Sequence, residues 1–149
     1  MSNKFKRGPL GAFLEALEKE KIDCILIGMM AAVEQGAPMS TIDYGLWVDL
    51  PSRQYMKFVT IVRHLEGISR SPTLYELKDS TQVNIIFQPD GLQSFQTEFK
   101  RSRWRHLDGQ RIKILPLRRV IASKMVSNRE KDLAVLPVLR RTLRFKEKL

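Results

Sequence analysis

Two apolar stretches in the first half of the chain decide the fold: Asp23-Cys-Ile-Leu-Ile-Gly28 and Ser40-Thr-Ile-Asp-Tyr-Gly-Leu-Trp-Val-Asp49. The first is a continuous apolar run closed by glycine, which is typical of a strand buried on both faces. The second is rich in Ile, Tyr, Trp and Val, and strand alternation places Asp43, Gly45 and Trp47 on one face. We therefore expect a central buried strand and, after a short connection, a second strand.

Helical and strand-like patterns extend outward from these two stretches. Apolar spacing predicts helices from residue 10 onward and over 29–35, 51–67, 92–99, 117–128 and 130–146, the last broken near 135 by Pro137. Strands are predicted over 74–77 and 82–88 as an antiparallel hairpin, and over 104–107 and 111–115, joined by Asp108-Gly109. This order, with no repeat of fixed period, predicts an α/β (α+β) fold with a mixed sheet flanked by helices.

Size and composition limit the class of protein. A chain of 149 residues with 43% hydrophobic and 28% charged residues is expected to form one soluble domain over residues 1–149. Its longest uncharged apolar run, residues 24–33, is too short to span a membrane, and the basic N-terminus lacks the apolar core of a secretory signal. We therefore expect a cytoplasmic protein that does not contact a membrane. One cysteine and two histidines exclude a structural zinc cluster.

The net charge of +10 is distributed unevenly along the chain. Residues 1–100 hold 11 basic and 12 acidic side chains, whereas residues 101–149 hold 15 basic and 4 acidic ones. The last third therefore carries the whole excess of positive charge. Such a segment predicts a polyanionic partner, most simply nucleotide phosphates or nucleic acid.

The order of polar residues on the predicted strands suggests a family. Gly28 follows the buried strand, Thr41-x-Asp43 opens the second, and Asn84 lies within a later one; Lys124 and the run Arg129-x-Lys131-Asp132 come near the end. Over residues 24–135 this order resembles the nucleotidyltransferase superfamily. The similarity is to its minimal members and to its toxin-type members from abortive-infection and toxin-antitoxin systems.

The resemblance implies a site and its partners. Asp43 would be the catalytic, metal-holding carboxylate, with Mg²⁺ or Mn²⁺ as cofactor if the protein is active. A nucleoside triphosphate would be bound by Gly28, Met29, Thr41, Asn84, Lys124 and Lys131. Asp132 would be the local ion partner of the two lysines. The acceptor would be an RNA or a protein, and an antitoxin protein is an implied partner.

The metal site departs from the family pattern at three positions. The family places carboxylates at positions 43 and 45 and on the later strand, and a second small residue after Gly28. Here these positions hold Gly45, Asn84 and Met29. Paired carboxylates at i and i+2 on one face of a strand are what shared Mg²⁺ ions require. We therefore expect an atypical or catalytically impaired enzyme.

Each of these residues also has a purely structural explanation. Asp43 could cap a neighbouring loop, Gly28 could serve a tight turn, and Asn84 could satisfy a turn. Lys124 falls within the stripe Leu117, Val120, Ile121 and Met125 that a helical wheel predicts to be buried, and its stem could extend to solvent. If this helix continues through Arg129, Lys131 lies on the same line as Lys124.

A basic and aromatic group in the last third predicts contact with nucleic acid. Arginine forks suit phosphates and an exposed tryptophan can stack on a base. The residues are Arg101, Arg103, Trp104, Arg105, Arg111, Arg140, Arg141 and Arg144. The alternative for each is a solvated face or a core tryptophan. The sequence thus predicts a nucleotidyltransferase-like protein that binds nucleotide or nucleic-acid phosphates, the alternative being a basic RNA- or DNA-binding module that is not an enzyme.

Overall fold

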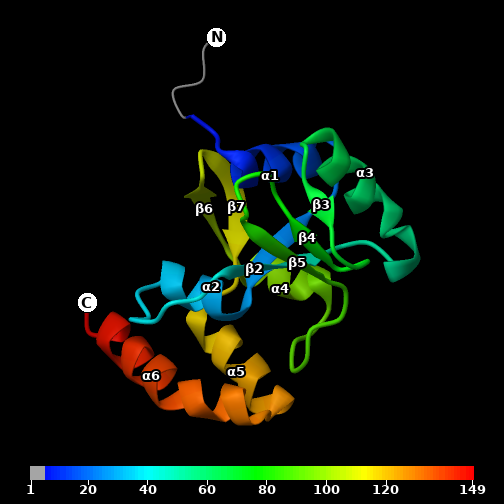
Figure 1. The fold of residues 1–149 in the computed structure, drawn as a ribbon. Coiled ribbons are helices and arrows are strands. Elements are labelled where there is room, and N and C mark those ends of the chain that lie inside the picture. Colours follow the sequence, from blue (N-terminus) through cyan, green and yellow to red (C-terminus); the bar gives the residue numbers. More distant parts are fainter. Residues whose placement is uncertain (1–5) are drawn as a thin grey trace.

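A seven-stranded mixed sheet forms the centre of the computed structural model, which describes residues 6–149 (Figure 1). Its strand order is β3-β4-β5-β2-β1-β7-β6. The strands are β1 (Cys24–Ile27), β2 (Asp43–Val48), β3 (Ile68–Ser69), β4 (Leu74–Glu76), β5 (Gln82–Ile86), β6 (Arg103–Leu107) and β7 (Gln110–Ile114). The mixed α/β class predicted from the sequence is confirmed.

β1 occupies the interior position that its apolar run predicts. It pairs antiparallel with β2 and parallel with β7, and Ile25 and Leu26 are completely buried. β2 in turn pairs parallel with β5, so that Gly45 lies between Ile27 on one side and Asn84 on the other. These pairings fix which residues share a face of the sheet.

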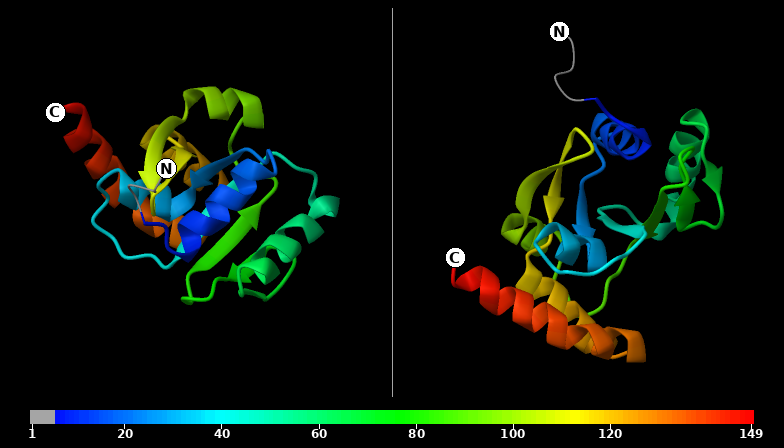
Figure 2. Two further views of the ribbon diagram at one scale, coloured as in Figure 1. Left: turned by 90° about the horizontal axis from the view of Figure 1, so that it is seen from above. Right: turned by 60° about the vertical axis from the view of Figure 1, so that its left-hand side comes forward.

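Helices cover both faces. They are α1 (Pro9–Lys19), α2 (Gly28–Glu34), α3 (Met56–His64), α4 (Phe95–Arg101), α5 (Leu117–Ser127) and α6 (Glu130–Glu147), with a 3-10 turn, η1 (Ser52–Gln54). In the view from above, α1 and α3 lie on one side of the sheet and α4 on the other (Figure 2). The last two helices, α5 and α6, pack side by side beyond the end of the sheet at which β1 leads into α2 (Figures 1 and 2).

Three helix predictions are wrong in detail. The helix predicted to open at residue 51 begins with η1, and α3 extends only to His64. α4 begins at Phe95 instead of residue 92, because Ser94 caps it by accepting a hydrogen bond from the Thr97 backbone N–H at 3.2 Å. α6 continues through Pro137 without the predicted break. Buried Leu136 and Leu139 on either side of the proline hold the helix in place.

Both predicted hairpins are confirmed. β4 pairs antiparallel with β5, and β6 pairs antiparallel with β7 through Asp108 and Gly109, whose φ angles of 51° and 76° are those of a two-residue turn. The Asp108 carboxylate also accepts hydrogen bonds from the backbone N–H groups of Gly8 and Gly11, at 3.0 and 2.7 Å. The hairpin turn therefore caps the N-terminus of α1.

No helix within residues 6–149 is long and apolar enough to cross a membrane.

Candidate functional site

A cleft of about 270 Å³ opens between one face of the sheet and helix α5. Its floor is formed by strand residues, one wall by α5, and the other by the loop that follows β5. The lining residues are Ile27, Gly28, Asn84, Ile86, Gln88, Pro89, Asp90, Leu115, Val120, Ser123, Lys124, Ser127 and Arg129. Three predicted nucleotide-binding residues, Gly28, Asn84 and Lys124, therefore meet in one cleft although they are distant in the sequence.

The register of the strands places Asp43 near this cleft but outside its lining. Because Gly45 pairs with Asn84, Asp43 lies two residues before it on the same face, about 8 Å from Asn84 between Cα atoms by strand spacing and rise. Asp43 is exposed at the start of β2, opposite Gln82. The strand register thus places Gly28, Asp43 and Asn84 at one part of the sheet, but of the three only Gly28 and Asn84 line the cleft.

The side chains at this part of the sheet do not fit a two-metal site. Gly45 offers no ligand, and a Cβ atom there would lie 3.1 Å from Ile86 Cδ1. Asn84 supplies an amide in place of a carboxylate. Within residues 6–149, no three His, Cys, Asp or Glu side chains are grouped so that they could hold a metal ion. Asp43 is left without the second carboxylate that shared Mg²⁺ or Mn²⁺ ions require.

The turn after β1 depends on the backbone conformation of Gly28. Gly28 has φ +72°, a conformation that favours glycine, and a Cβ at this residue would meet no atom within 4 Å. Met29 packs against the hydrophobic core, and Thr41 precedes β2. Neither Met29 nor Thr41 lines the cleft, so the structure does not bring these two predicted nucleotide-binding residues to it.

The helical wall holds two cations on one buried carboxylate. Lys124 Nζ donates to Asp132 Oδ1 at 3.2 Å, and Arg129 Nε donates to Asp132 Oδ2 at 2.8 Å. Asp132 is completely buried, and the side chain of Lys124 is 16% exposed. Burial alone would raise the pKa of Asp132, but the hydrogen bonds from Arg129 and Lys124 lower that pKa below its usual value. The prediction that Asp132 is an ion partner is confirmed for Lys124.

Lys131 does not lie on the same line as Lys124. α5 ends at Ser127, and Asn128 adopts a left-handed conformation with φ 51°, so that the helical phase starts again in α6. Lys131 is exposed, and the cleft is lined instead by Arg129. The predicted burial of Met125 is also wrong, because it is 51% exposed near the end of α5.

Two contacts that sequence reasoning missed hold the loop wall against α5. Glu98, completely buried on α4, accepts hydrogen bonds from Arg119 of α5 at 3.1 and 2.6 Å and from the Gln93 backbone N–H at 2.8 Å. Ser123 and Ser127 donate to the backbone and side-chain oxygens of Asp90. Ser123 and Ser127, which lie near Lys124 on α5, were the only sign of this contact in the sequence. The position of the loop after β5, which supplies Asp90, was not predictable.

The pKa of Glu98 reflects this contact. Burial would raise it, but the hydrogen bonds from Arg119 and the Gln93 backbone, together with the charges of Arg119 and Arg101, lower it below the usual value. Arg119 has a raised pKa, chiefly through its hydrogen bond to Glu98. The two shifts agree on a charged pair that fastens α4 to α5.

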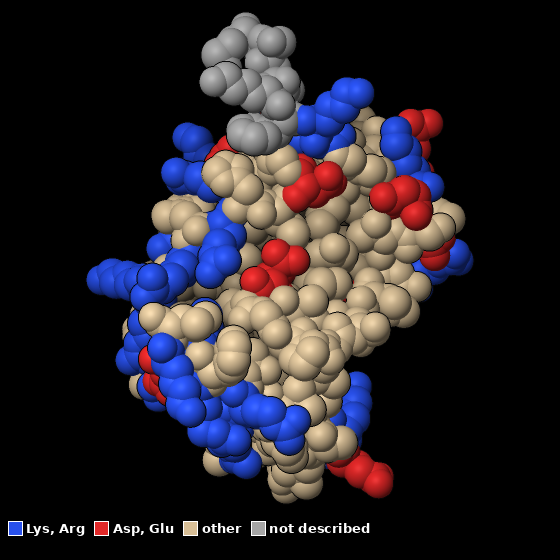
Figure 3. Space-filling model, turned by 90° about the vertical axis from the view of Figure 1, so that its left-hand side faces the viewer, with Lys and Arg blue, Asp and Glu red and all other residues tan. Residues whose placement is uncertain are grey.

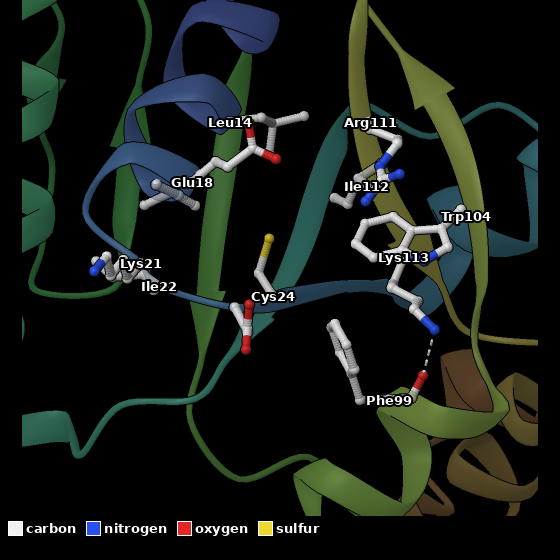
Figure 4. Close-up of a pocket in the computed structure, with 12 residues that line it drawn as sticks. Leu14, Glu18, Lys21, Ile22, Cys24, Phe99, Trp104, Arg111, Ile112 and Lys113 are labelled. Carbon is white, nitrogen blue, oxygen red and sulfur yellow. Dashed lines mark hydrogen bonds between the residues drawn. The ribbon is translucent and has the colours of Figure 1, made fainter.

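A second hollow of about 70 Å³ lies between α1, α4 and the β6–β7 hairpin, close to Trp104 (Figure 4). The Trp104 ring is 46% exposed, but the Arg111 guanidinium carbon lies 3.9 Å from its centroid and Lys113 Nζ lies 5.1 Å away. Cations therefore already contact the ring that was predicted to stack on a base. Burial and then Asp23 raise the pKa of Cys24 in this hollow to about 12, so the thiol is protonated at neutral pH.

The basic residues of the last third lie on the surface. Lys and Arg side chains gather over the side of the molecule that β6 and α6 form (Figure 3). Arg101 lies 4.0 Å from Glu98. The other predicted arginines are exposed and have no carboxylate within 4 Å among residues 6–149; they are Arg103, Arg105, Arg111, Arg140, Arg141 and Arg144.

Comparisons with known proteins identify the fold. No protein-family model matches the chain, and no curated protein matches it in sequence. Several solved structures are similar, including the following three. The solution structure of the antibiotic-resistance factor ANT(2'')-Ia has a TM-score of 0.58 at 13% identity, over 90% of this chain and 82% of that one. The lincomycin-bound lincosamide antibiotic adenylyltransferase LnuA has a TM-score of 0.56 at 13% identity, over 93% of this chain and 98% of that one.

An antigenic nucleotidyltransferase-like protein from Paracoccidioides brasiliensis is the third, with a TM-score of 0.53 at 16% identity, over 86% of this chain and 72% of that one. At these identities the similarity is one of fold. The chain therefore has the mixed α/β fold of nucleotidyltransferases, as its sequence predicted.

Proposed function

We propose that the cleft binds the phosphates of a nucleotide and that the protein is a nucleotidyltransferase-like binder with impaired catalysis. The observation that carries this proposal is the pairing of Lys124 and Arg129 on buried Asp132, which aims two cations at one cleft. The two cations share Asp132. Asp90, a carboxylate that lines the cleft, accepts a hydrogen bond from Ser127 and its charge also acts on Arg129, so a bound phosphate would compete with Asp90 for the guanidinium. The cleft volume of about 270 Å³ lies close to the lower end of the range for small-molecule sites.

Asp43 is proposed as the residual carboxylate of the site and the only one of the family's three that is retained. Loss of the other two supports binding in place of two-metal transfer. Antibiotic substrates belong to the similar structures, ANT(2'')-Ia and LnuA, and nothing in this cleft favours them. A relation to toxin-type members, with an antitoxin partner, remains a prediction of the sequence resemblance.

Nucleotide binding is tested by titrating ATP, GTP, CTP and UTP into the protein and measuring the melting temperature and the heat of binding. We expect at least one nucleotide to bind, and Arg129→Gln to weaken that binding about tenfold without unfolding the protein, because Lys124 still satisfies Asp132. Lys57→Gln, which removes an exposed lysine on α3, is the control with an equal change in charge. No stabilisation by any nucleotide, or equal losses in both variants, would contradict the proposal.

Lys131→Gln separates the sequence resemblance from the observed geometry. The resemblance places Lys131 on the triphosphate, whereas the structure places Arg129 in the cleft and Lys131 on the exposed side of α6. We expect Lys131→Gln to bind the nucleotide as the unmodified protein does. A loss of nucleotide affinity equal to that of Arg129→Gln would instead support the contact between Lys131 and the triphosphate that the resemblance implies.

A second candidate function, nucleic-acid binding without transfer, is supported by a different observation. The exposed arginines of β6 and α6 have no carboxylate partners among the described residues, so their charge is available to an external anion. This candidate does not depend on the cleft.

A further inference from the structure

Three cations from distant parts of the chain meet beside α2. Arg103 and Arg105 point to the same side of β6, because they are two residues apart on a strand. Lys146, near the end of α6, donates from Nζ to Gln35 Oε1 at 3.1 Å. Gln35, Arg103 and Arg105 line one shallow hollow. We call Arg103, Arg105 and Lys146 the basic junction.

The basic junction has no internal counter-charge within residues 6–149. No carboxylate lies within 4 Å of any of its three members, and Glu147, next to Lys146, pairs with Arg118 instead. Burial, and then the charges of Arg105 and Arg103, lower the pKa of Lys146. The cations therefore repel one another across two elements, and an anion that contacts all three would relieve the repulsion.

The shape and continuation of the basic junction indicate a long anion. The hollow measures about 10 Å³, close to the volume of a single water-sized sphere, so it cannot enclose a nucleotide. Further exposed cations lie on the outward side of α6 and just after its end, around the helix from Lys146, namely Arg140, Arg141, Arg144 and Lys148. A polymer of regularly spaced phosphates can contact this series, and arginine forks suit phosphate oxygens.

We propose that the basic junction binds the phosphodiester backbone of a nucleic acid, at a site separate from the cleft. The proposal deepens the second candidate function by placing its contact at Lys146 and Gln35 as well as at the arginines. A membrane surface fits less well, because a membrane-binding helix needs a free apolar face. In α6 the apolar residues Leu136 and Leu139 are buried, and the large exposed ones, Leu133 and Phe145, are twelve residues apart and form no continuous apolar face.

The test is fluorescence anisotropy with a labelled 20-nucleotide single-stranded RNA, and the DNA of the same sequence, over a series of salt concentrations. For the unmodified protein we expect the logarithm of the association constant to fall linearly with the logarithm of salt concentration. The triple variant Arg103→Gln, Arg105→Gln, Lys146→Gln should bind at least tenfold more weakly. Its salt slope should be smaller by about 2, since each contacted phosphate contributes about 0.7 on a single strand.

A matched control removes three cations elsewhere. Arg53, Lys57 and Arg63 are exposed on η1 and α3, and replacing all three by Gln gives the same net charge as the junction variant. We expect this control to retain at least half of the affinity and the full salt slope. Equal losses in both triple variants would show an effect of net charge alone and would overturn the proposal.

Two further measurements keep the result interpretable. Circular dichroism melting should show the same transition for the junction variant as for the unmodified protein, because its three residues are exposed, and nucleotide binding in the cleft should be unchanged. Absence of salt-dependent RNA and DNA binding by the unmodified protein would overturn the proposal. So would binding to vesicles of 70% phosphatidylcholine and 30% phosphatidylserine that depends on the basic junction when RNA binding does not.

Discussion

The sheet floor of the cleft and its helical wall carry different kinds of side chain. The sheet floor has Asn84 at a position where the family resemblance implies a carboxylate, and the same holds for Gly45, which pairs with Asn84 but does not line the cleft. The helical wall keeps Lys124 and Arg129, both fixed by a carboxylate that is completely buried. Within the described residues, no group of carboxylates that could hold a metal ion thus lies on the sheet side of the site, while cations that could meet a phosphate are present on the helical side, so the two kinds of side chain occur independently in this molecule.

The largest expected effect comes from breaking the helical wall. Asp132→Asn keeps the shape of the side chain but leaves Lys124 largely buried without a counter-charge. We expect the free energy of unfolding to fall by about 2–3 kcal/mol, because a buried ion pair that loses one partner is strongly destabilising. Urea denaturation measures this change, and nucleotide binding should weaken with it. A variant as stable as the unmodified protein would show that Asp132 is not the anchor of this wall.

A smaller effect is expected at Glu98, which fastens the loop wall to α5. Glu98→Gln should lower the free energy of unfolding at pH 7 by about 2 kcal/mol, since it weakens a charged hydrogen bond to Arg119. The pKa of Glu98 is lowered in the folded protein, so its stabilisation is complete above the ordinary value of 4.5. It is lost as the pH falls through the lowered pKa.

Urea denaturation between pH 7 and pH 3 tests this pH dependence. The unmodified protein should lose stability more steeply below pH 4.5 than Glu98→Gln does. Parallel profiles for the two proteins would contradict a stabilising role for the Glu98 carboxylate. Glu66→Gln, on the exposed turn after α3, serves as the control carboxylate and should follow the unmodified protein.

The smallest expected effect is a gain of metal binding on the sheet floor. Gly45→Asp combined with Asn84→Asp restores the missing carboxylates beside Asp43 on one face. We expect Mn²⁺ binding, measured by calorimetry, to tighten about tenfold, equivalent to about 1.4 kcal/mol. Adding Ile86→Val should improve it further, because Ile86 Cδ1 would lie 3.1 Å from a Cβ at residue 45. Unchanged Mn²⁺ affinity in both variants would mean that carboxylates at residues 45 and 84 are not sufficient to form a metal site beside Asp43.

Local sequence patterns predicted most of the fold. The apolar run around Ile25, the alternation around Trp47 and the Asp108-Gly109 turn each depend on nearby residues, and all three elements formed as expected. The two-residue strand β3 was missed because so short a segment carries no periodicity. The helix break at Pro137 was wrong because packing of Leu136 and Leu139 outweighs one missing hydrogen bond.

The candidate site was predictable only in part. Gly28, Asn84 and Lys124 were identified from their order along the chain, and they do line one cleft. Arg129 lines the cleft in place of the predicted Lys131 because Asn128 has a left-handed conformation. This single residue ends α5 and changes the direction in which the side chains of α6 point. Asp90 and Glu98 lie on segments whose position is set by contacts with α5, and no pattern in the sequence reports such contacts.

The cap that Asp108 forms on α1 has a consequence for folding. Its two hydrogen bonds close loops of 97 and 100 residues, and β1 pairs along one edge with β7. Contacts of such high sequence separation form late and slow the folding of a chain. During synthesis, β1 therefore lacks its neighbour β7, and α1 lacks its Asp108 cap, until residues 101–149 have emerged from the ribosome. The basic last third thus completes the folding of the near-neutral first hundred residues.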